Sequence, residues 1–599
     1  MRGIEKFAAG LFFGTLAVAA WLGVVCATGL ATGSWRWSLS ELVQAGRGGQ
    51  LTMGPVFWVV MVLGIILAVV MMLGLRAWDQ NHGGGGGQQK TRTRREAEAH
   101  KVKFPEVRAQ LSKKQALQRG RETLKATQAP VSTDPKENAA AAAVFAESLP
   151  DDQLVTRIGK LGGKDLWAQS EDSKGVLAPP REGKTNYLAV ELVRDAPGPV
   201  LATSTKADLL MITGVGRQAK GRVWVLDMEA MTGWPDQVRW NPVAGCDDVE
   251  VAIRRGQAWA GAQPMNGVKG GDWFNSKAGA VLGRLLHVAA ISGKSMRDVV
   301  TWSNNLQSKE PQNLLHQHGE IAAPGVLEYL EGVANSRAGE TTDSIQQTLS
   351  GLLEPLAAPR VLEQLSPPPG QEFDIHRFLT SEADSLVLVC DEQIGLDTAP
   401  LVSMFANEVL SEARRISQAE RGGRFWPAVR FVLDEAPNLA AFPKMPSIVA
   451  DSGGRGIEVF WFAQAESQLV DRWGENGAKT ILASTNVRYY LPGLDLETVK
   501  PLSEQMGTFD RKRTSMTKQA DGSVSRSQQD EERPVMRPEE IQQLPSRSAI
   551  VRYRNLRPMH LQLTPWWERP DAEQIKKEQL EAAQMCGKLP GASRARTIR

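Results

Sequence analysis

Cysteine is scarce in this chain. Only four cysteines occur in 599 residues, and they lie far apart at Cys26, Cys246, Cys390 and Cys586. Their spacing excludes a disulfide framework and a structural zinc site, and it indicates a reducing compartment. Net charge is also low, at +3, so the overall balance indicates no nucleic-acid partner.

Charged residues are missing from two long stretches near the N-terminus, 7–35 and 48–75. Each stretch exceeds the ~20 apolar residues that cross a bilayer, so we expect two transmembrane helices. A cleaved signal peptide is an alternative for the first stretch. That stretch is too long for a signal peptide, however, and no small-x-small cleavage site closes it.

Basic residues predict the orientation of these helices. The segment between them carries only Arg36 and Arg47. The flanking segments are richer in Lys and Arg, at Arg2, Lys6, Arg76, Lys90, Arg92, Arg94 and Arg95. The positive-inside rule therefore places both termini in the cytoplasm and predicts a multi-pass protein of the cytoplasmic (inner) membrane, with its bulk in the cytoplasm.

A flexible, basic linker is expected after the second stretch. Residues 83–87 are all glycine, and residues 88–135 hold twelve Lys or Arg against five Asp or Glu. Such a segment could contact anionic lipid or nucleic acid, or remain a solvated neck. We expect the boundary of the next domain near Leu149.

A phosphate-binding loop is predicted after a short strand, 173–178, and before a helical run that starts at 186. Its residues are Pro180, Arg181, Glu182, Gly183, Lys184 and Thr185. In such a loop, backbone N–H groups cradle the phosphates, Lys184 neutralises the β- and γ-phosphates, and Thr185 holds Mg²⁺. The pattern has glycine six residues before the lysine, and this chain has Ala178 there, so the loop could be slightly reshaped.

An acidic pair follows a second apolar run. Residues 429–433 form a run that is apolar except for Arg430 and predicts a strand ending at Asp434 and Glu435. Such a run is typical of a strand buried on both faces of a parallel sheet. Asp434 is expected to hold Mg²⁺ through water, and Glu435 to activate the attacking water.

Alternating strands and helices predict an α/β fold with a doubly wound, mostly parallel sheet. The expected strands are 173–178, 199–203, 223–226, 385–389, 429–433, 458–462 and 487–491. Their carboxyl ends should bring Lys184, Asp434 and Gln464 together. Residues 247–380 show helical periodicity and predict an all-α insertion, in which Trp259, Trp273 and Trp302 are core residues or stacking platforms.

The order of motifs resembles the type IV coupling proteins, the conjugative TraG/TraD-like ATPases of type IV secretion systems. The resemblance covers roughly 173–564 and the two-span anchor. The matching motifs are P-P-x-x-G-K-T at 179–185, TSTK at 203–206, WNP at 240–242, LDEA at 433–436, GRG at 454–456, QAESQL at 464–469, WG at 473–474, DLET at 495–498 and RPEEI at 537–541.

This resemblance implies a RecA-like ATPase that uses ATP and Mg²⁺ and assembles as a homo-hexamer. It would drive single-stranded DNA bound to a relaxase, with accessory transfer proteins or protein substrates, to the channel components of a type IV secretion system. By residue match, Arg455 is implied as an arginine finger and Gln464 as a γ-phosphate sensor. A plain turn arginine and a strand-end cap are the alternatives for these two residues.

The expected domains are an anchor at 1–82, a hinge and neck at 83–149, two motor parts at 150–246 and 381–567 around the insertion at 247–380, and a charged tail at 568–599. A hairpin turn is expected at 520–523. Two other functions stay open. One is a double-stranded DNA translocase of the FtsK/SpoIIIE kind, and the other is a docking receptor that binds nucleotide with little turnover, which only Ala178 favours.

Overall fold

The computed structural model describes residues 96–128, 130–263, 271–335, 339–368, 370–391, 397–518 and 524–588, with scattered positions between 18 and 69. The chain divides into two compact units, 1–100 and 101–599. The predicted membrane stretches, 7–35 and 48–75, lie largely outside the described residues and stay predictions. Within the described parts of the chain, no helix is both long enough and apolar enough to cross a bilayer.

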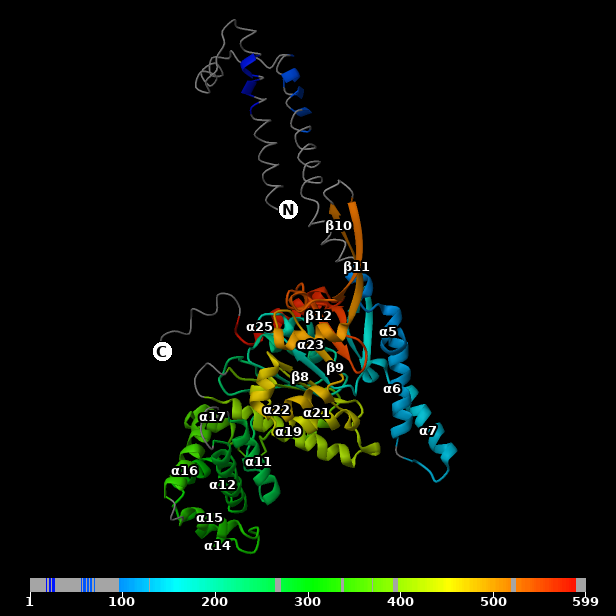
Figure 1. Ribbon diagram of the computed structural model, residues 1–599. Helices are drawn as coiled ribbons and strands as arrows, with labels where there is room; N and C mark the ends of the chain where they lie inside the picture. The colour runs from blue at the N-terminus through cyan, green and yellow to red at the C-terminus, as the bar shows by residue number, and fades with distance from the viewer. Residues whose placement is uncertain are drawn as a thin grey trace. The chain divides into compact units, whose positions relative to one another are not determined.

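Eleven strands within the described residues form one sheet in the second unit (Figure 1). In spatial order they are β2 (Lys164–Gln169), β1 (Val155–Leu161), β13 (Met559–Gln562), β12 (Ser548–Tyr553), β9 (Val487–Tyr490), β3 (Lys174–Leu177), β8 (Ile457–Ala463), β7 (Val429–Leu433), β4 (Val200–Ser204), β6 (Ser385–Val389) and β5 (Val223–Asp227). The section from β9 to β5 is parallel, and it contains all seven strands that the sequence predicted.

The sheet is mixed, because β2, β1, β13 and β12 pair antiparallel at one end. The sequence analysis did not predict these four strands. Since β12 runs opposite to β9 and β13 runs opposite to β12, β13 points the same way as β9 and β3. The chain that leaves β13 therefore emerges at the same edge as the phosphate loop that leaves β3.

Helices cover both faces of this sheet. One face packs against the π-helical turn η1 (Thr185–Ala189) and the helices α9 (Val190–Arg194), α10 (Asp208–Gln218) and α25 (Ala572–Met585). Phe460 and Phe462 of β8 belong to this core. Trp461, between them, donates to the Thr485 hydroxyl at the end of α22 (Glu466–Ser484), over a distance of 3.0 Å. A side chain at Gly175 of β3 would overlap the Trp461 ring, so this position needs glycine.

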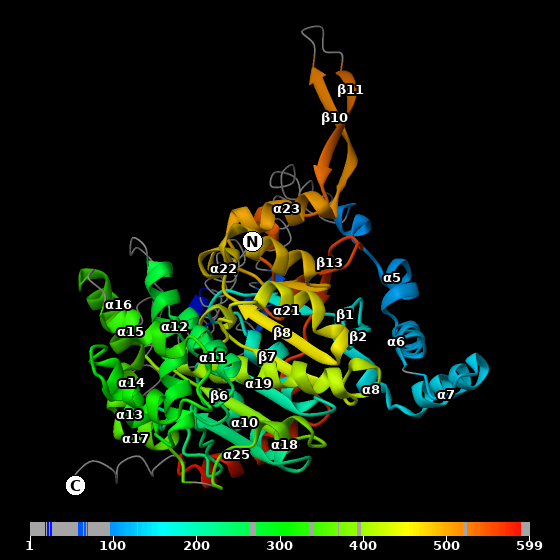
Figure 2. The ribbon, with the colours of Figure 1, turned by 90° about the horizontal axis from the view of Figure 1, so that it is seen from below.

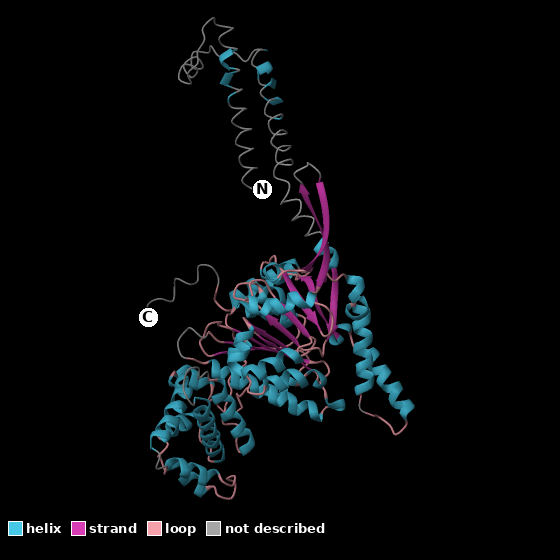
Figure 3. Ribbon diagram, viewed as in Figure 1, coloured by secondary structure: helices cyan, strands magenta, loops and turns pink. Residues whose placement is uncertain are grey.

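Between β5 and β6, the elements longer than an isolated bridge are all helical among the described residues (Figure 3). They are α11 (Val249–Ala262), α12 (Gly271–Ile291), α13 (Met296–Ser303), α14 (Glu310–Gln317), α15 (Val326–Ala334), α16 (Gly339–Leu353), η2 (Glu354–Ala357), α17 (Pro359–Gln364) and α18 (Ile375–Leu379). Helices α11 and α12 cross closely because Gly256 lies against the backbone of Gly279 and Gly283. Trp259 and Trp302 are buried, whereas Trp273 is 48% exposed.

The predicted neck continues into helices from residue 104. They are α5 (Phe104–Leu111), α6 (Lys113–Thr127), α7 (Pro135–Ser148) and α8 (Asp151–Leu154). Asp134 caps α7 by accepting from the Lys136 amide at 2.8 Å. Val107 and Leu111 join the sheet core, so α5 packs on the motor instead of standing free in solvent.

A long hairpin projects from the sheet (Figure 2). Its strands are β10 (Thr508–Lys518) and β11 (Val524–Pro534), paired antiparallel in one continuous register. The turn predicted at 520–523 lies outside the described residues, between the two strand ends. The segment predicted as a charged tail, 568–599, begins at the last residue of η5 (Trp566–Glu568) and contains α25, which packs against α10.

Candidate functional site

The phosphate loop runs from the end of β3 to the start of η1. Gly183 has φ of 82°, and a Cβ there would lie 2.4 Å from the Tyr187 ring, so glycine is required on both counts. Arg181 also has a positive φ, of 70°, which stores backbone strain in the loop. Lys184 and Thr185 then open the helical run, and η1 continues directly into α9.

Ala178 does not lie in the strained part of the loop. Its amide donates to the carbonyl of Ala463 at 3.0 Å, so it extends the pairing of β3 with β8. Its φ is not positive, and its side chain is fully buried. Alanine is therefore compatible with this position, and the expected reshaping of the loop has no conformational cause.

The acidic pair lies directly after β7, where the sequence predicted it. Asp434 is held in place by its own carbonyl, which accepts from the Thr203 hydroxyl of β4 at 2.8 Å. Glu435 adopts a left-handed conformation with φ of 49°, which turns the chain sharply into α20 (Ala436–Leu439). Both carboxylates are buried.

Four of the predicted site residues meet at this edge of the sheet. Lys184 Nζ lies 3.0 Å from Asp434 Oδ1 and also forms an ion pair with Glu435 Oε1. The Gln464 side-chain amide donates to the same oxygen of Glu435 at 3.1 Å. The convergence of Lys184, Asp434 and Gln464 expected from the strand ends is thus observed.

Burial and charge act against each other in this cluster. Burial raises the pKa of Asp434, and the Lys184 ammonium only partly offsets that effect. Burial lowers the pKa of Lys184, but the carboxylates of Asp434 and Glu435 outweigh it and raise the pKa above its ordinary value. Lys184 is therefore held as a cation, which is the form that binds phosphate.

The cluster suits a Mg²⁺–nucleotide better than a free metal ion. Among the described residues, no group of three or more His, Cys, Asp or Glu could hold a metal ion. Mg²⁺ commonly binds through one or two carboxylates together with substrate phosphates; Asp434 offers a carboxylate here, and Thr185 follows Lys184 as the first residue of η1. Glu435 Oε2 is buried without a hydrogen-bond partner, so this site retains an unused acceptor.

Arg455 lies away from this cluster. It ends the short turn η4 (Gly453–Arg455) just before β8, whereas Gln464 follows the other end of β8. A seven-residue strand is roughly 20 Å long, so Arg455 and Lys184 of one chain lie at opposite edges of the sheet. Arg455 Nε donates to Asp451 Oδ2 at 2.7 Å, and this bond lowers the pKa of Asp451.

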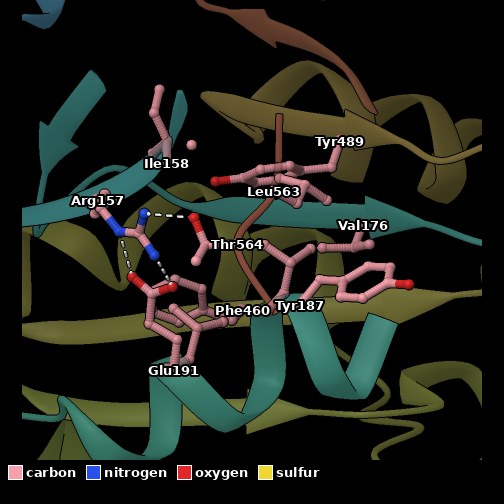
Figure 4. Close-up of a pocket in the computed structure, with 12 residues that line it drawn as sticks. Arg157, Ile158, Val176, Tyr187, Glu191, Phe460, Tyr489, Leu563 and Thr564 are labelled. Carbon is pink, nitrogen blue, oxygen red and sulfur yellow. Dashed lines mark hydrogen bonds and ion pairs between the residues drawn. The ribbon is translucent and has the colours of Figure 1, made fainter. Parts of the chain in front are cut away.

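A hollow between the sheet and the helical run of η1 and α9 is separate from the Lys184 cluster (Figure 4). It is lined by Val176, Phe460 and Tyr489 in the strands and by the inward side of η1 and α9. Arg157 and Glu191 close it with an ion pair, in which Arg157 Nε lies 2.8 Å from Glu191 Oε1. Because it faces the middles of the strands, this hollow is a packing gap and not the phosphate site.

The sequence analysis missed Trp566 and Trp567, which lie beside the loop. Trp566 Nε1 donates to Asn186 Oδ1 at 3.1 Å, so the segment after β13 touches the residue that follows Thr185. The only signal in the sequence was a Trp-Trp pair after a stretch, 559–564, in which apolar and polar residues alternate. Nothing local to it indicates a contact with a helix so far away in the chain.

Comparison with known proteins gives a consistent result. A family profile described as "Type IV secretory system Conjugative DNA transfer" matches residues 132–588, most of the chain. Protein VirD4 of Rhizobium rhizogenes is 24% identical over 403 residues, which cover 64% of this chain and 57% of that protein. Conjugal transfer protein TraG of Escherichia coli is 23% identical over 406 residues, 61% of each chain. The match thus spans about three fifths of these relatives.

Solved structures share the fold. The bacterial conjugative coupling protein TrwBΔN70 superposes with a TM-score of 0.50 at 18% identity, covering 74% of this chain and 91% of that one. The plasmid coupling protein TrwB in complex with ADP and Mg²⁺ also has a TM-score of 0.50, at 18% identity, covering 66% and 85%. The RecA-like α/β architecture with its large mixed sheet is therefore common to these proteins.

Proposed function

This chain belongs to the type IV secretory system conjugative DNA transfer family, the type IV coupling proteins, and we propose that it is a membrane-anchored ATPase motor. It recruits single-stranded DNA bound to a relaxase, together with protein substrates, and drives them into a type IV secretion channel. The observation that carries the proposal is the contact of Lys184 with Asp434 and Glu435, with Gln464 beside them.

Each residue of this cluster has a separate task in ATP hydrolysis. The loop 180–185 cradles the phosphates, and Lys184 neutralises the β- and γ-phosphates. Thr185 and Asp434 would hold Mg²⁺, which would supply positive charge that offsets the negative charge of the phosphates. Glu435 accepts the proton of the attacking water, and Gln464 orients that water or the carboxylate.

The pairing of Lys184 with Glu435 suggests how the base is kept inactive without substrate. A phosphate group competes with the two carboxylates for the Lys184 ammonium. When the ammonium turns to the phosphate, Glu435 loses its cationic partner, and its carboxylate is free to accept a hydrogen bond from water. Hydrolysis is then coupled to correct seating of the γ-phosphate.

Arg455 acts on a neighbouring subunit. Its position at the far edge of the sheet supports this proposal, because it cannot reach the phosphates bound by its own chain. A ring of identical subunits, a hexamer in our proposal, brings the edge that carries Arg455 of one copy to the nucleotide of the next. The guanidinium then stabilises the charge of the transferring phosphoryl group.

The proposed location is the inner membrane, with two spans at 7–35 and 48–75 and both termini in the cytoplasm. The apolar stretches and the basic residues that flank them support this location. The alternative of a docking receptor with little turnover is weakened, because Ala178 extends a strand and leaves the loop intact.

The test is ATP hydrolysis by the full-length protein in detergent or nanodiscs. We expect turnover that needs Mg²⁺ and that single-stranded DNA stimulates more than double-stranded DNA. Turnover no greater than that of Lys184→Ala, with or without DNA, contradicts the motor. Stronger stimulation by double-stranded DNA favours the FtsK/SpoIIIE-like alternative.

A further inference from the structure

Three aromatic rings meet beside the phosphate loop, and we call them the aromatic platform: Tyr187 of η1, and Trp566 and Trp567 of η5. The ring centroids of Tyr187 and Trp567 lie 6.2 Å apart, and those of Trp566 and Trp567 lie 5.6 Å apart. Both pairs meet edge to face, at interplanar angles of 66° and 81°. The platform is therefore packed by specific ring contacts and is not a chance surface cluster.

The platform lies on the nucleoside side of the loop. Asp434 and Glu435 follow β7, on one side of β3, and mark where the γ-phosphate lies. The platform follows β13, on the other side of β3 and at the same edge of the sheet. A nucleotide whose phosphates occupy the loop must extend its nucleoside away from the acidic pair, toward the platform.

The contact with the loop is direct. Trp566 donates to the side chain of Asn186, the residue after Thr185, at 3.1 Å. Tyr187 covers Gly183 of the loop, since a Cβ on that glycine would overlap its ring. The platform and the phosphate-binding residues thus share one short stretch of backbone.

The segment that carries Trp566 and Trp567 is held by hydrogen bonds at both ends. Before it, Thr564 accepts a hydrogen bond from Arg157 at 3.1 Å, as Figure 4 shows. After it, Arg569 forms two bonds of 2.8 and 2.9 Å with the carboxylate of Asp195, at the end of α9. The platform is therefore pre-organised against the loop helix, which lowers the entropy cost of binding a planar ligand.

Trp567 leaves ring surface available to a ligand. It is 37% exposed. The Arg547 guanidinium lies 5.9 Å from the centre of its ring and pairs with Glu568. An exposed indole with a guanidinium close by can hold a flat, electron-rich heterocycle by stacking and cation–π contact.

We propose that the aromatic platform is the base-binding site of this ATPase, in which the purine ring of the nucleotide stacks on Trp567. Trp566 positions that ring through its bond to Asn186. The inference rests on the proposed nucleotide binding by the loop. Stacking predicts a preference for purine over pyrimidine triphosphates, since the larger ring covers more of the indole.

The test compares ligands with and without a base. Full-length wild type and Trp567→Ala are titrated with ATP, CTP and inorganic tripolyphosphate, each with Mg²⁺, by isothermal calorimetry. We expect Trp567→Ala to weaken ATP binding roughly 10- to 100-fold, the range of one base–aromatic stack. Tripolyphosphate should bind both proteins equally, and the preference for ATP over CTP should disappear in the variant.

Two further variants keep the outcome clear. Trp567→Phe retains an aromatic face and should recover most of the ATP affinity. Trp273→Ala removes an exposed tryptophan from the insertion and should leave all three affinities unchanged. An equal loss of ATP and tripolyphosphate in Trp567→Ala, or no loss of either, overturns the proposal.

Failure of this inference is distinguishable from failure of the proposed function. Lys184→Ala should lose both ATP and tripolyphosphate, because it removes a phosphate contact. If it does so while Trp567→Ala binds ATP normally, the nucleotide site stands and the base lies elsewhere. If Lys184→Ala binds both ligands normally, the nucleotide site itself is wrong.

Discussion

The ammonium of Lys184 lies 3.0 Å from a carboxylate oxygen of Asp434, although the two residues come from distant parts of the chain. Adjacent parallel strands β3, β8 and β7 bring them together, since the loops at the carboxyl ends of such strands share one edge. This contact joins the phosphate loop to the acidic pair in one site. The following predictions test the parts of that site and the structure that supports it.

Binding and hydrolysis should separate between Lys184 and Glu435. Lys184→Ala removes the cation that neutralises phosphate, so we expect loss of ATP binding. Glu435→Gln keeps the size of the side chain but removes the base, so ATP should bind while kcat falls about 10²- to 10⁴-fold. Calorimetry and phosphate release measure the two effects, and normal turnover of Glu435→Gln would refute its role as the base.

Arg455 should act on the neighbouring subunit. Arg455→Ala is expected to lower turnover by about 10³-fold or more and to leave ATP affinity largely intact. Mixing it with Lys184→Ala should restore some activity, because one interface then has both an intact loop and an intact finger. Phosphate release across mixing ratios measures this recovery.

Arg414 supplies the matched control for Arg455. It donates to the same oxygen of Asp451, at 2.8 Å. Arg414 lies on α19 (Ala399–Ala419), however, and not in the turn that carries Arg455. Arg414→Ala should therefore retain most of the turnover. Equal loss in both variants would mean that Arg455 only supports Asp451, and a lack of recovery at every mixing ratio would also count against a role in trans.

Lys174 should make stability depend on pH above 8. Burial lowers its pKa from 10.5 to about 8, and its ammonium donates to the carbonyls of Gln169, Ser170 and Asp172. Below pH 8 the Lys174 side chain is protonated in both the folded and the unfolded chain. The fold then carries the full free-energy cost of burying the ammonium. As the pH rises from about 8 to 10.5, the folded chain releases the proton while the unfolded chain keeps it, so the penalty is relieved.

Lys174→Met isolates that effect. The free energy of unfolding of the wild type should rise relative to that of Lys174→Met over this pH window, by on the order of 3 kcal/mol. Urea unfolding at intervals from pH 7.5 to 10.5 measures the difference between the two proteins. A difference that stays constant with pH would show that Lys174 titrates at its ordinary pKa.

Arg254 and Arg255 form a matched pair at the joint between the insertion and the motor. Both contact Glu408 of α19 (Ala399–Ala419), but the Arg255 side chain is 8% exposed and that of Arg254 is 41% exposed. Arg255→Ala leaves a buried carboxylate without its main partner and should destabilise the fold by about 3–5 kcal/mol. Arg254→Ala should cost less than about 1 kcal/mol. Chemical denaturation measures both, and equal effects would refute this assignment.

The proposed anchor should tether the motor without taking part in its chemistry. Deletion of residues 1–82 should move the protein from the membrane to the soluble fraction of a cell extract. The shortened chain should bind ATP with unchanged affinity and hydrolyse it slowly unless it is concentrated, because the anchor raises the local concentration of subunits. If the full chain sedimented as an aggregate that detergent does not dissolve, and not with the membranes, that result would contradict the anchor.

Much of the parallel sheet was predictable from sequence. Strands such as β6, and β7 apart from Arg430, are short apolar runs bounded by polar residues, and that pattern is local. The loop at 180–185 and the acidic pair could also be recognised, because their chemistry requires particular residue types at fixed spacing. The antiparallel strands β1 and β2 were missed because neither is a regular apolar run. The first two residues of β2, Lys164 and Asp165, are exposed, and a bulge near Gly159 interrupts β1.

The sequence by itself determined the phosphate loop, the acidic pair and the positions of the parallel strands along the chain, because each is encoded within a few neighbouring residues. Only the tertiary structure decided that Ala178 extends a strand, that Arg455 lies at the far edge of the sheet, and that Trp566 bonds to Asn186. These facts depend on strand register and on two reversals of direction, through β12 and β13. Long-range pairing of this kind is set by the packing of the whole sheet and leaves no local pattern in the chain.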